Sequence, residues 1–300
     1  MARVLILQLK QSMYYTYRMD VESNLKLQQD YINKVATIVK QYDSVDSIFL
    51  VGSHSKGENT PFSDIDICLL FKTDLRENRE DIFKRILELS PTLSHLYLFD
   101  SEGLFLFVNG IRLDVTFIKP TDFEKLALNK VKIIQDLNGM VAEKYTQTKD
   151  AEEKPSKPKW NESEGDFLDW FFWMFRQIYC YILQAGLKPD KRFDKLNSAQ
   201  SSIKSVRDKL IDMLVYLNNK KDYINSIDKN ISGEFEKTYS SLNPTDMLLA
   251  TRKLADIYEI IGREYAKRIN TSFPDAKLVT TKALFNEFDN LYKEIVVLTS

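Results

Sequence analysis

The hydrophobic and polar positions follow different patterns in the two halves of the chain. In the first half, short apolar runs bounded by turn residues alternate with segments in which apolar residues recur every three or four positions. These periods are typical of strands and of amphipathic helices, respectively. The pattern predicts strands at 47–52, 65–71, 94–99, 104–108 and 111–118, and helices at 24–41, 77–89 and 121–129. We therefore expect an α+β domain in which helices flank one mixed sheet.

The second half of the chain has helical periodicity and almost no strand signal. We predict helices at 165–184, 198–217, 246–269 and 282–296, which together form a helical bundle. Apolar residues surround the first of these helices almost completely, so it should be the central member of the bundle. Its aromatic residues Trp170, Phe172 and Trp173 are expected in the core, and a stacking wall for a bound acceptor is the alternative.

A polar segment separates the two halves. Residues 146–163 are rich in charge and contain Pro155 and Pro158, a composition typical of linkers. We therefore predict a first domain at residues 1–145, a linker at 146–163 and a helical-bundle domain at 164–300. The apolar run at 4–9 should form a short strand or an ordered lead-in.

Chemically distinctive residues gather in the segment 48–71. A predicted buried strand runs into Gly52 and Ser53, and Asp64 and Asp66 stand at the start of the next strand. Side chains two positions apart in a strand project to the same face, so these two carboxylates should lie side by side. Mg²⁺ is usually held by one or two carboxylates together with the phosphate oxygens of a nucleotide. The segment predicts a nucleotide and metal site, and the alternative is an ordinary surface turn with a solvated acidic pair.

The corner at Gly52 and Ser53 is suited to binding a phosphate. Glycine lets the backbone turn tightly and approach a ligand. Turn N–H groups, the Ser53 hydroxyl and a helix that starts near Ser55 would supply hydrogen-bond donors, and Lys56 adds a positive charge. The segment is not a Walker loop, because its glycine, lysine and hydroxyl residues lack that spacing.

A third carboxylate, Asp114, lies in the segment 104–118. Asn109 and Gly110 divide this segment into two apolar runs, and the dipeptide predicts a hairpin closed by a type I′ turn. Alternation along the second strand then places Asp114 on its polar face. A charged residue within a strand faces either a site or solvent, and the upstream acidic pair favours a site.

These residues resemble the motifs of the nucleotidyltransferase superfamily with the DNA polymerase β-like fold, and within it the aminoglycoside and lincosamide antibiotic nucleotidyltransferases. The resemblance covers the first half of the chain, where 131–141 is also similar to the strand and turn that close the catalytic domain. It implies catalytic and metal-binding roles for Asp64, Asp66 and Asp114, and nucleotide binding by Gly52, Ser53, Lys56 and Ser63. Many family members carry arginine where this chain has Lys56, so the phosphate contact would be a point charge rather than a bidentate fork.

The resemblance implies transfer of a nucleoside monophosphate from a triphosphate, with ATP as the expected donor, to a hydroxyl of a small acceptor, with release of pyrophosphate. Mg²⁺ at the carboxylates would offset charge on the reacting phosphate. Asp114 would complete the metal coordination or accept the proton of the acceptor hydroxyl. In kanamycin-type relatives a glutamate near the domain boundary is implicated as general base, which makes Glu162 and Glu164 further candidates. Acidic residues at this position also stabilise a helix N-terminus without a catalytic role.

The overall charge favours a small acceptor over nucleic acid. The chain has 42 basic and 43 acidic side chains and a net charge of −1, so it lacks the general attraction to phosphate backbones that supplies most nucleic-acid affinity. The lysine clusters at 154–159 and 188–195 are expected to be solvated. Two alternatives stay open, namely nucleotidyl transfer to RNA or protein and a non-catalytic nucleotide-binding or toxin–antitoxin-like module. Three acids argue against the second, because a degenerate site has no physical reason to keep mutually repelling carboxylates together.

Cysteine usage and hydropathy favour a cytoplasmic protein. Cys68 and Cys180 fall in a predicted core strand and in an apolar helix, which is not the pattern of a disulfide-stabilised domain. The apolar run at 4–9 is far shorter than the roughly 20 residues that cross a bilayer, and it lacks the features of a signal peptide. We expect no membrane association, and the exposed helical faces leave room for a homodimer.

Overall fold

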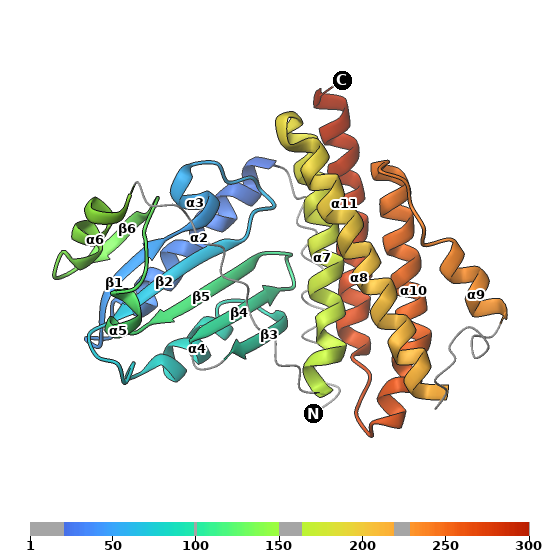
Figure 1. The fold of residues 1–300 in the computed structure, drawn as a ribbon, viewed down its shortest axis with the longest axis horizontal. Helices are drawn as coiled ribbons and strands as arrows, with labels where there is room; N and C mark the ends of the chain where they lie inside the picture. Colours follow the sequence, from blue (N-terminus) through green and yellow to red (C-terminus); the bar gives the residue numbers. More distant parts are fainter. Residues whose placement is uncertain (1–20, 99–100, 150–163, 219–228, 300) are drawn as a thin grey trace.

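The structure is a computed structural model and describes residues 21–98, 101–149, 164–218 and 229–299. We call the described residues within 21–149 the sheet part and those within 164–299 the helical part. Figure 1 shows the two parts side by side, with helix α7 at the boundary between the sheet and the other helices. A mixed sheet with flanking helices, followed by a helical region, confirms the predicted fold class. The predicted element at 4–9 and residues 150–163 of the predicted linker lie outside the described residues.

The sheet of the described chain contains six strands in the order β3-β4-β5-β2-β1-β6. Their bounds are β1 Val45–Leu50, β2 Ile65–Phe71, β3 Thr92–Leu98, β4 Glu102–Phe107, β5 Arg112–Ile118 and β6 Lys132–Asp136. β2 and β5 run parallel, and the other neighbouring pairs are antiparallel. β2 is buried on both faces, because Ile67 and Leu69 pack into one hydrophobic cluster while Cys68 and Leu70 pack into another.

Helices cover the two faces of the sheet unequally. The helices of the sheet part are α2 (Val21–Val39), α3 (Gly52–Lys56), α4 (Arg79–Leu87), α5 (Pro120–Phe123) and α6 (Met140–Thr148). α2 and α4 pack on the face that carries Ile67. On the other face, α5 and α6 contribute Phe123 and Val141 to a small cluster. The rest of this face, including Leu104 and Leu106 of β4, packs against the helical part.

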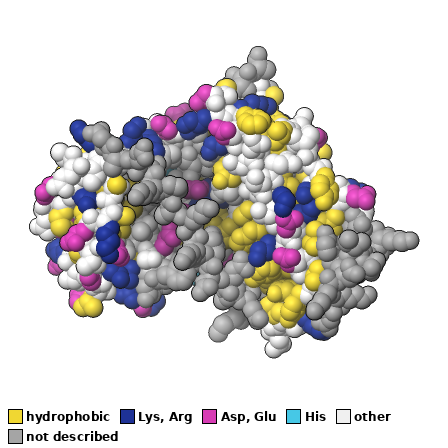
Figure 2. All heavy atoms as spheres, viewed as in Figure 1, with side chains coloured by type: hydrophobic (Ala, Val, Ile, Leu, Met, Phe, Trp, Pro, Cys, Tyr) yellow, Lys and Arg dark blue, Asp and Glu magenta, His cyan; other side chains and the backbone are white. Residues whose placement is uncertain are grey.

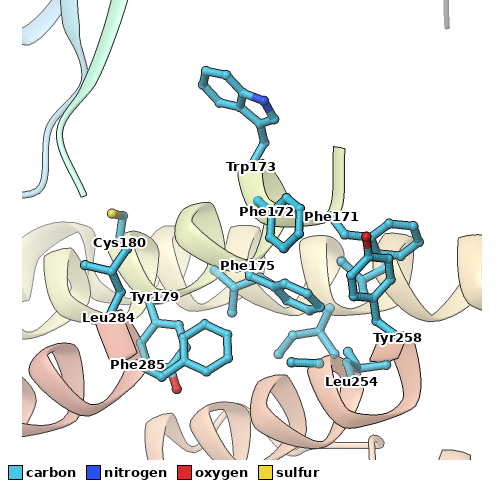
Figure 3. Packing of buried hydrophobic residues seen from close by; sticks show 14 of the residues in the cluster. Phe171, Phe172, Trp173, Phe175, Tyr179, Cys180, Leu254, Tyr258, Leu284 and Phe285 are labelled. Atoms are coloured by element: carbon cyan, nitrogen blue, oxygen red, sulfur yellow. The ribbon is translucent and has the colours of Figure 1, made fainter. Parts of the chain in front are cut away.

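The helical part is built around the aromatic side chains of α7. Its elements are α7 (Glu164–Leu187), the 3₁₀ turn η1 (Pro189–Lys191), α8 (Arg192–Asn218), α9 (Lys229–Glu236), α10 (Pro244–Arg268) and α11 (Asp275–Thr299). α7 contacts α8, α10 and α11, in agreement with the prediction of a central helix. Phe171 stacks on Tyr258 with ring centroids 4.4 Å apart, and Tyr179 stacks on Phe285 at 4.6 Å (Figure 3). Such aromatic pairs add about 0.5–1.5 kcal/mol each beyond the area they bury.

One face of α7 departs from the predicted all-round apolar helix. Figure 3 shows Trp173 and Cys180 on the side of α7 away from Phe175 and Tyr179. Arg176 is three positions after Trp173 and four before Cys180, so it belongs to the same face, which contacts the sheet part. Of the three aromatic residues expected in the core, Phe172 and Trp173 are buried and Trp170 is partly buried. α7 therefore joins the aromatic core of the helical part to the sheet.

The hairpin between β4 and β5 differs from the predicted type I′ turn. Gly110 has a positive φ of 79°, whereas Asn109 does not. The Gly110 N–H donates to the Phe107 carbonyl at 2.9 Å, and the Asn109 side chain accepts from the Ile111 N–H at 3.2 Å. Asn109 also donates to the Tyr31 hydroxyl at 3.0 Å. This contact with α2 helps to hold a longer loop than the dipeptide alone predicts.

The helix predicted at 121–129 is also wrong, because α5 ends at Phe123. Leu128 packs instead in the cluster with Val141 of α6, and its N–H donates to Thr148 Oγ1 at 2.8 Å. Packing against α6 thus overrides the local helical period. The hydrophobic pattern predicts neither α6 nor α9, and residues 146–148 of the predicted linker belong to α6.

Candidate active site

The three carboxylates expected at the site project from one face of the sheet. Asp66 of β2 and Asp114 of β5 are direct partners across the parallel pair, and Asp64 precedes β2 by one residue. Because side chains alternate along a strand, this face also carries Cys68 and Leu70, and it is opposite to the face covered by α2 and α4. The carboxylates therefore lie on the face that the helical part completes.

Gly52 brings the predicted phosphate corner against Asp66. Its φ is +65°, a left-handed conformation that favours glycine, and a Cβ added there would lie 2.5 Å from Asp66 Oδ2. The Val51 N–H also donates to the Asp66 carbonyl at 3.2 Å. The helix at this corner, α3, begins at Gly52 rather than near Ser55 and has five residues. Such a short helix has a weak dipole, so donors at this corner are individual N–H groups and side chains.

Two arginines that the sequence motifs do not reveal bind the carboxylates. Arg112 binds Asp114 with a bidentate fork, Nε to Oδ1 at 2.9 Å and Nη2 to Oδ2 at 2.6 Å. Its Nη1 also lies 3.3 Å from Asp64 Oδ2. Arg176 of α7 donates through Nη1 to Asp64 Oδ1 and through Nε to the Gly110 carbonyl at 3.0 Å. Two of the three carboxylates are thus paired with guanidinium groups.

The carboxylates differ in their tendency to hold a proton. Burial alone would raise the pKa of Asp64, but the charges of Arg112 and Arg176 outweigh it and hold that pKa below its usual value. Burial raises the pKa of Asp66 to about 7, and repulsion from Asp114 and Asp64 adds to the shift. Burial also raises the pKa of Asp114, although the Arg112 fork opposes the rise. Asp66 is the carboxylate whose charge is least compensated.

A chain of contacts from the helical part supports Arg112. Its guanidinium lies 5.4 Å from the centre of the Trp173 ring, and its Nη1 donates to Gln177 Oε1 at 3.1 Å. Trp173 Nε1 donates to Ser94 Oγ at 3.1 Å, and the Ser94 hydroxyl donates to Asp169 Oδ2 at 2.9 Å. The position of Arg112 therefore depends on how α7 docks against β3.

The other site residues expected from the sequence have different surroundings. Ser53 is partly exposed in α3, and Lys56 is exposed at its end. Ser63 is buried, and its hydroxyl accepts from the Thr60 N–H at 2.9 Å, so it stabilises the loop before β2. Of the two candidate general bases, Glu164 is the first residue of α7 and Glu162 lies outside the described residues.

His54 adds an unsatisfied polar atom to the phosphate corner. It is 9 % exposed, and its buried Nε2 has no hydrogen-bond partner among the described residues. Burial lowers the pKa of His54 to about 4, with Lys132 adding to the shift and Asp64 opposing it, so the ring is neutral at pH 7. A buried polar atom without a partner costs about 1–3 kcal/mol. The corner therefore fits a bound ligand that supplies the missing hydrogen bond.

Lysines of the helical part gather beside the loop that follows α3. Lys188 Nζ donates to the Glu58 carbonyl at 2.5 Å, and Lys191 Nζ lies 3.6 Å from the Glu58 carboxylate. Burial and repulsion from Lys188 and Lys191 lower the pKa of Lys195, while attraction to Asp64 opposes the change. These lysines, expected from the sequence to be solvated, form a concentration of positive charge that an anion would compensate.

The carboxylates offer hard oxygen donors for a divalent cation, but they do not form a ready cage of three ligands. Across the described ranges, no group of three His, Cys, Asp or Glu side chains is placed to hold a metal ion. Arg112 and Arg176 instead bind oxygens of Asp64 and Asp114. Mg²⁺ needs only one or two carboxylates when nucleotide phosphates supply further oxygens. The donor set, with Asp66 against the glycine corner, therefore fits a cation that arrives with a nucleotide.

A family model matches the sheet part of the chain, and two solved structures are distantly similar. Residues 32–146 match the family model described as a nucleotidyltransferase domain. An aminoglycoside 6-adenyltransferase from Bacillus subtilis is similar at 14% identity with a TM-score of 0.31, over 87% of this chain and 97% of that chain. A STING-associated CdnE c-di-GMP synthase from Capnocytophaga granulosa is similar at 13% identity with a TM-score of 0.29, over 99% of this chain and 94% of that chain. No curated protein matches the chain significantly.

The family match and the geometry of the site concern the same residues. Gly52, Asp64, Asp66 and Asp114 all lie within the matched range of 32–146. In the structure these residues come from the β1–α3 corner and from the neighbouring strands β2 and β5. Residues 32–146 thus match a nucleotidyltransferase domain, which indicates that the protein is a transferase enzyme.

Proposed function

We propose that this protein uses Mg²⁺ to transfer a nucleoside monophosphate from an NTP, with ATP as the expected donor, to a hydroxyl of a small-molecule acceptor, with release of pyrophosphate. The position of Asp66 carries the proposal. Asp66 is the partner of Asp114 across β2 and β5, and its Oδ2 lies against the Gly52 corner. This arrangement supports a cation and a phosphate held next to each other.

Asp64 and Asp66 are the proposed cation ligands, together with phosphate oxygens of the nucleotide. When bound, the cation supplies Lewis-acid stabilisation of the charge that develops on the reacting phosphate. Asp114 would complete this site or accept the proton of the acceptor hydroxyl. Either role uses an oxygen that Arg112 now contacts. Arg112 and Arg176 reduce the repulsion between the acids.

The phosphate tail of the nucleotide is assigned to the Gly52 corner and to the positive charge beside it. Backbone N–H groups and the Ser53 hydroxyl supply donors at the corner. The cluster of Lys188, Lys191 and Lys195 supports the same assignment, because its mutual repulsion would be relieved by an anion. His54 offers one further hydrogen bond through its unpartnered nitrogen.

The charge distribution supports a small acceptor rather than nucleic acid. The net charge is −1, and Figure 2 shows basic and acidic side chains interspersed over the visible face. Nucleic-acid-binding surfaces instead gather lysine and arginine into one patch or stripe.

We assign the acceptor to the boundary between the sheet and α7. The catalytic domain would then span 1–145 and the acceptor-binding helical domain 164–300.

The proposal extends to location and assembly. Cys68 and Cys180 are buried free thiols, which supports a reducing compartment such as the cytoplasm. Leu249 and Ile260 of α10 and Val279 of α11 are exposed large apolar side chains, and they form the proposed surface for a homodimer. Among the described helices, none has both the length and the apolar character to cross a membrane.

The test follows a labelled nucleotide. The purified protein is incubated with each NTP labelled at the α-phosphate, with Mg²⁺, and with a panel of hydroxylated small molecules and RNAs. We expect label on a small acceptor, ATP as the best donor, one pyrophosphate released per product, and far less product from Asp66→Asn. Label on RNA or on a polypeptide would replace the small acceptor with a macromolecule. Nucleotide binding without any transfer, over the whole panel, would contradict the proposed activity.

A further inference from the structure

Arg176 connects the helical part to the carboxylates of the sheet part. Its side chain is 3 % exposed, so its charge has to be compensated inside the protein. Nη1 donates to Asp64 Oδ1, and Nε donates to the Gly110 carbonyl at 3.0 Å. Arg176 is therefore held from two directions by the sheet part, although it belongs to helix α7.

The two oxygens of Asp64 have different partners. Oδ1 accepts from Arg176, while Oδ2 lies 3.3 Å from Arg112 Nη1. Arg112 also has its bidentate fork on Asp114, so it keeps a carboxylate partner if it leaves Asp64. For Arg176, Asp64 is the carboxylate partner within the described ranges. Binding of another cation to Oδ2 of Asp64 would therefore cost less free energy than binding to Oδ1. Arg176 determines this difference, because it occupies Oδ1.

We propose that Arg176 is a positioning residue of the nucleotidyl-transfer site, which holds Asp64 by Oδ1 and so presents Oδ2 to the incoming metal–nucleotide complex. This inference rests on the proposed function. A carboxylate whose second oxygen is already hydrogen-bonded has less rotational freedom to lose when it binds a cation. Because Arg176 lies on α7, the carboxylate is oriented only when the helical part is seated on the sheet.

A purely structural role for Arg176 leads to a different expectation. Arg207 of α8 is a matched case, since it is also buried and donates from Nε and Nη2 to Thr238 at 2.8 and 2.5 Å. Thr238 also lies in the helical part. Among the described residues, Arg207 makes no contact with the carboxylates of the site. Removing either guanidinium should lower the melting temperature. Only the loss of Arg176 should change cation binding.

The direction of the change separates positioning from charge compensation. If Arg176 served only as a positive charge, its removal would leave the acids more negative and would tighten cation binding. If Arg176 orients Asp64, its removal weakens cation binding in spite of that charge effect. Residues that orient metal ligands typically contribute about 10- to 100-fold to metal affinity or activity. Lysine keeps the charge but cannot reproduce the two directions of the guanidinium.

The experiment compares Arg176→Met, Arg176→Lys and Arg207→Met with the wild type. Mn²⁺ affinity is measured by electron paramagnetic resonance with a non-hydrolysable ATP analogue, and kcat, KM and melting temperature are measured alongside. We expect Mn²⁺ binding about 10- to 100-fold weaker and a lower kcat for Arg176→Met, with a smaller loss for Arg176→Lys. Arg207→Met should bind Mn²⁺ like the wild type. If Arg176→Met does not fold, Arg176→Lys carries the test with the same expected direction.

Unchanged or tighter Mn²⁺ binding by folded Arg176→Met would overturn the inference. An equal loss of binding in Arg207→Met would overturn it as well, because it would indicate general loosening of the helical part. Failure of the proposed function looks different, since Asp66→Asn would then bind Mn²⁺ and nucleotide like the wild type. If Asp66→Asn loses Mn²⁺ binding while Arg176→Met keeps it, only the role of Arg176 is wrong.

Discussion

The two faces of strand β2 have opposite physical character. On one face, Ile65, Ile67 and Leu69 are completely buried beneath α2 and α4. On the other, Asp64 and Asp66 are brought next to Asp114 and two arginines. Burying the apolar face stabilises the fold, whereas burying carboxylates costs free energy unless they are paired. A step of one residue along the strand therefore separates the part of the molecule that stabilises the fold from the part proposed to carry the chemistry.

The charged face is only partly compensated. Arg112 and Arg176 neutralise Asp64 and Asp114, while the pKa of Asp66 is raised to about 7 by burial and by the neighbouring acids. Strongly shifted pKa values gather at functional sites, because the arrangements that shift them are the ones that bind ions and move protons. Variants on the charged face should therefore mainly lower activity, and variants on the apolar face should mainly lower stability.

The largest effect is expected for Asp66→Asn. The amide keeps the shape of the side chain but removes the charge proposed to bind the cation, so turnover should fall by about 10³-fold, or about 4 kcal/mol in the barrier. Because burial destabilises the charged carboxylate, the melting temperature at pH 8 should not fall. Steady-state kinetics and thermal unfolding of the same preparation check both points. A folded variant with full turnover would remove Asp66 from the proposed site.

The apolar face should respond with the reverse pattern. Ile67→Ala opens a cavity in the cluster beneath α2 and α4, and it should lower the free energy of unfolding by about 2–5 kcal/mol. The kcat of the folded protein should stay near that of the wild type. Urea unfolding followed by circular dichroism measures the loss, and Leu75→Ala at an exposed position of the sheet part is the control, with a change of about 0.5 kcal/mol or less. If kcat fell together with stability, the apolar face would contribute to turnover as well as to stability, and the contrast between the two faces would be wrong.

An intermediate effect is expected for Gly52→Ala, which changes the backbone and the site together. The φ of +65° costs a non-glycine residue about 1–2 kcal/mol, and the new methyl group would also meet Asp66 Oδ2 at 2.5 Å. Stability and turnover should both fall. Gly139→Ala is the matched control, because its φ is +73° and nothing lies within 4 Å of the added Cβ. It should lose stability without a comparable loss of turnover, and equal turnover losses would show that contact with Asp66 is unimportant.

The last expected effect is a pH dependence of stability that comes from Asp66. Its pKa of about 7 in the folded protein is above that of an ordinary carboxyl in the unfolded chain, so the folded state holds a proton that the unfolded state has released. The resulting stabilisation is fully present below the unfolded pKa and is lost as the pH rises through about 7. At about 1.4 kcal/mol for each unit of pKa shift, the full loss should be on the order of 4 kcal/mol.

Urea unfolding of the wild type and of Asp66→Asn at a series of pH values isolates this contribution. The stability of the wild type relative to Asp66→Asn should fall between about pH 5 and about pH 8. A relative stability that stays flat or rises over this window would mean that Asp66 is not the group responsible.

Much of the sheet and all three acids follow from local sequence patterns. The strand predicted at 65–71 has the same bounds as β2, because a continuous apolar run between turn residues is a local property. Alternation along that strand also places Asp64 and Asp66 together. The same reasoning fails at 121–129, where contacts of Leu128 with α6 override the helical period.

The partner of Arg112 can be predicted from neighbouring residues, whereas the partner of Arg176 cannot. Arg112 stands two positions before Asp114, so the sequence already places both on one strand face. Arg176 is a lone cation in the apolar stretch 170–183, which signals a buried partner without naming it. That partner, Asp64, is 112 residues away in the chain. A pairing over such a separation depends on how α7 docks against the sheet.

By itself, the sequence determined an acidic face on β2 and β5, a glycine corner beside it and a helical second half, because alternation and periodicity act over a few neighbouring residues. Only the tertiary structure decided which cation compensates which acid. Arg112 and Arg176 compensate Asp64 and Asp114, whereas the charge of Asp66, which lies against Gly52, is the least compensated of the three. The physical reason is that electrostatic energies depend on distances between side chains, and packing between distant segments sets those distances.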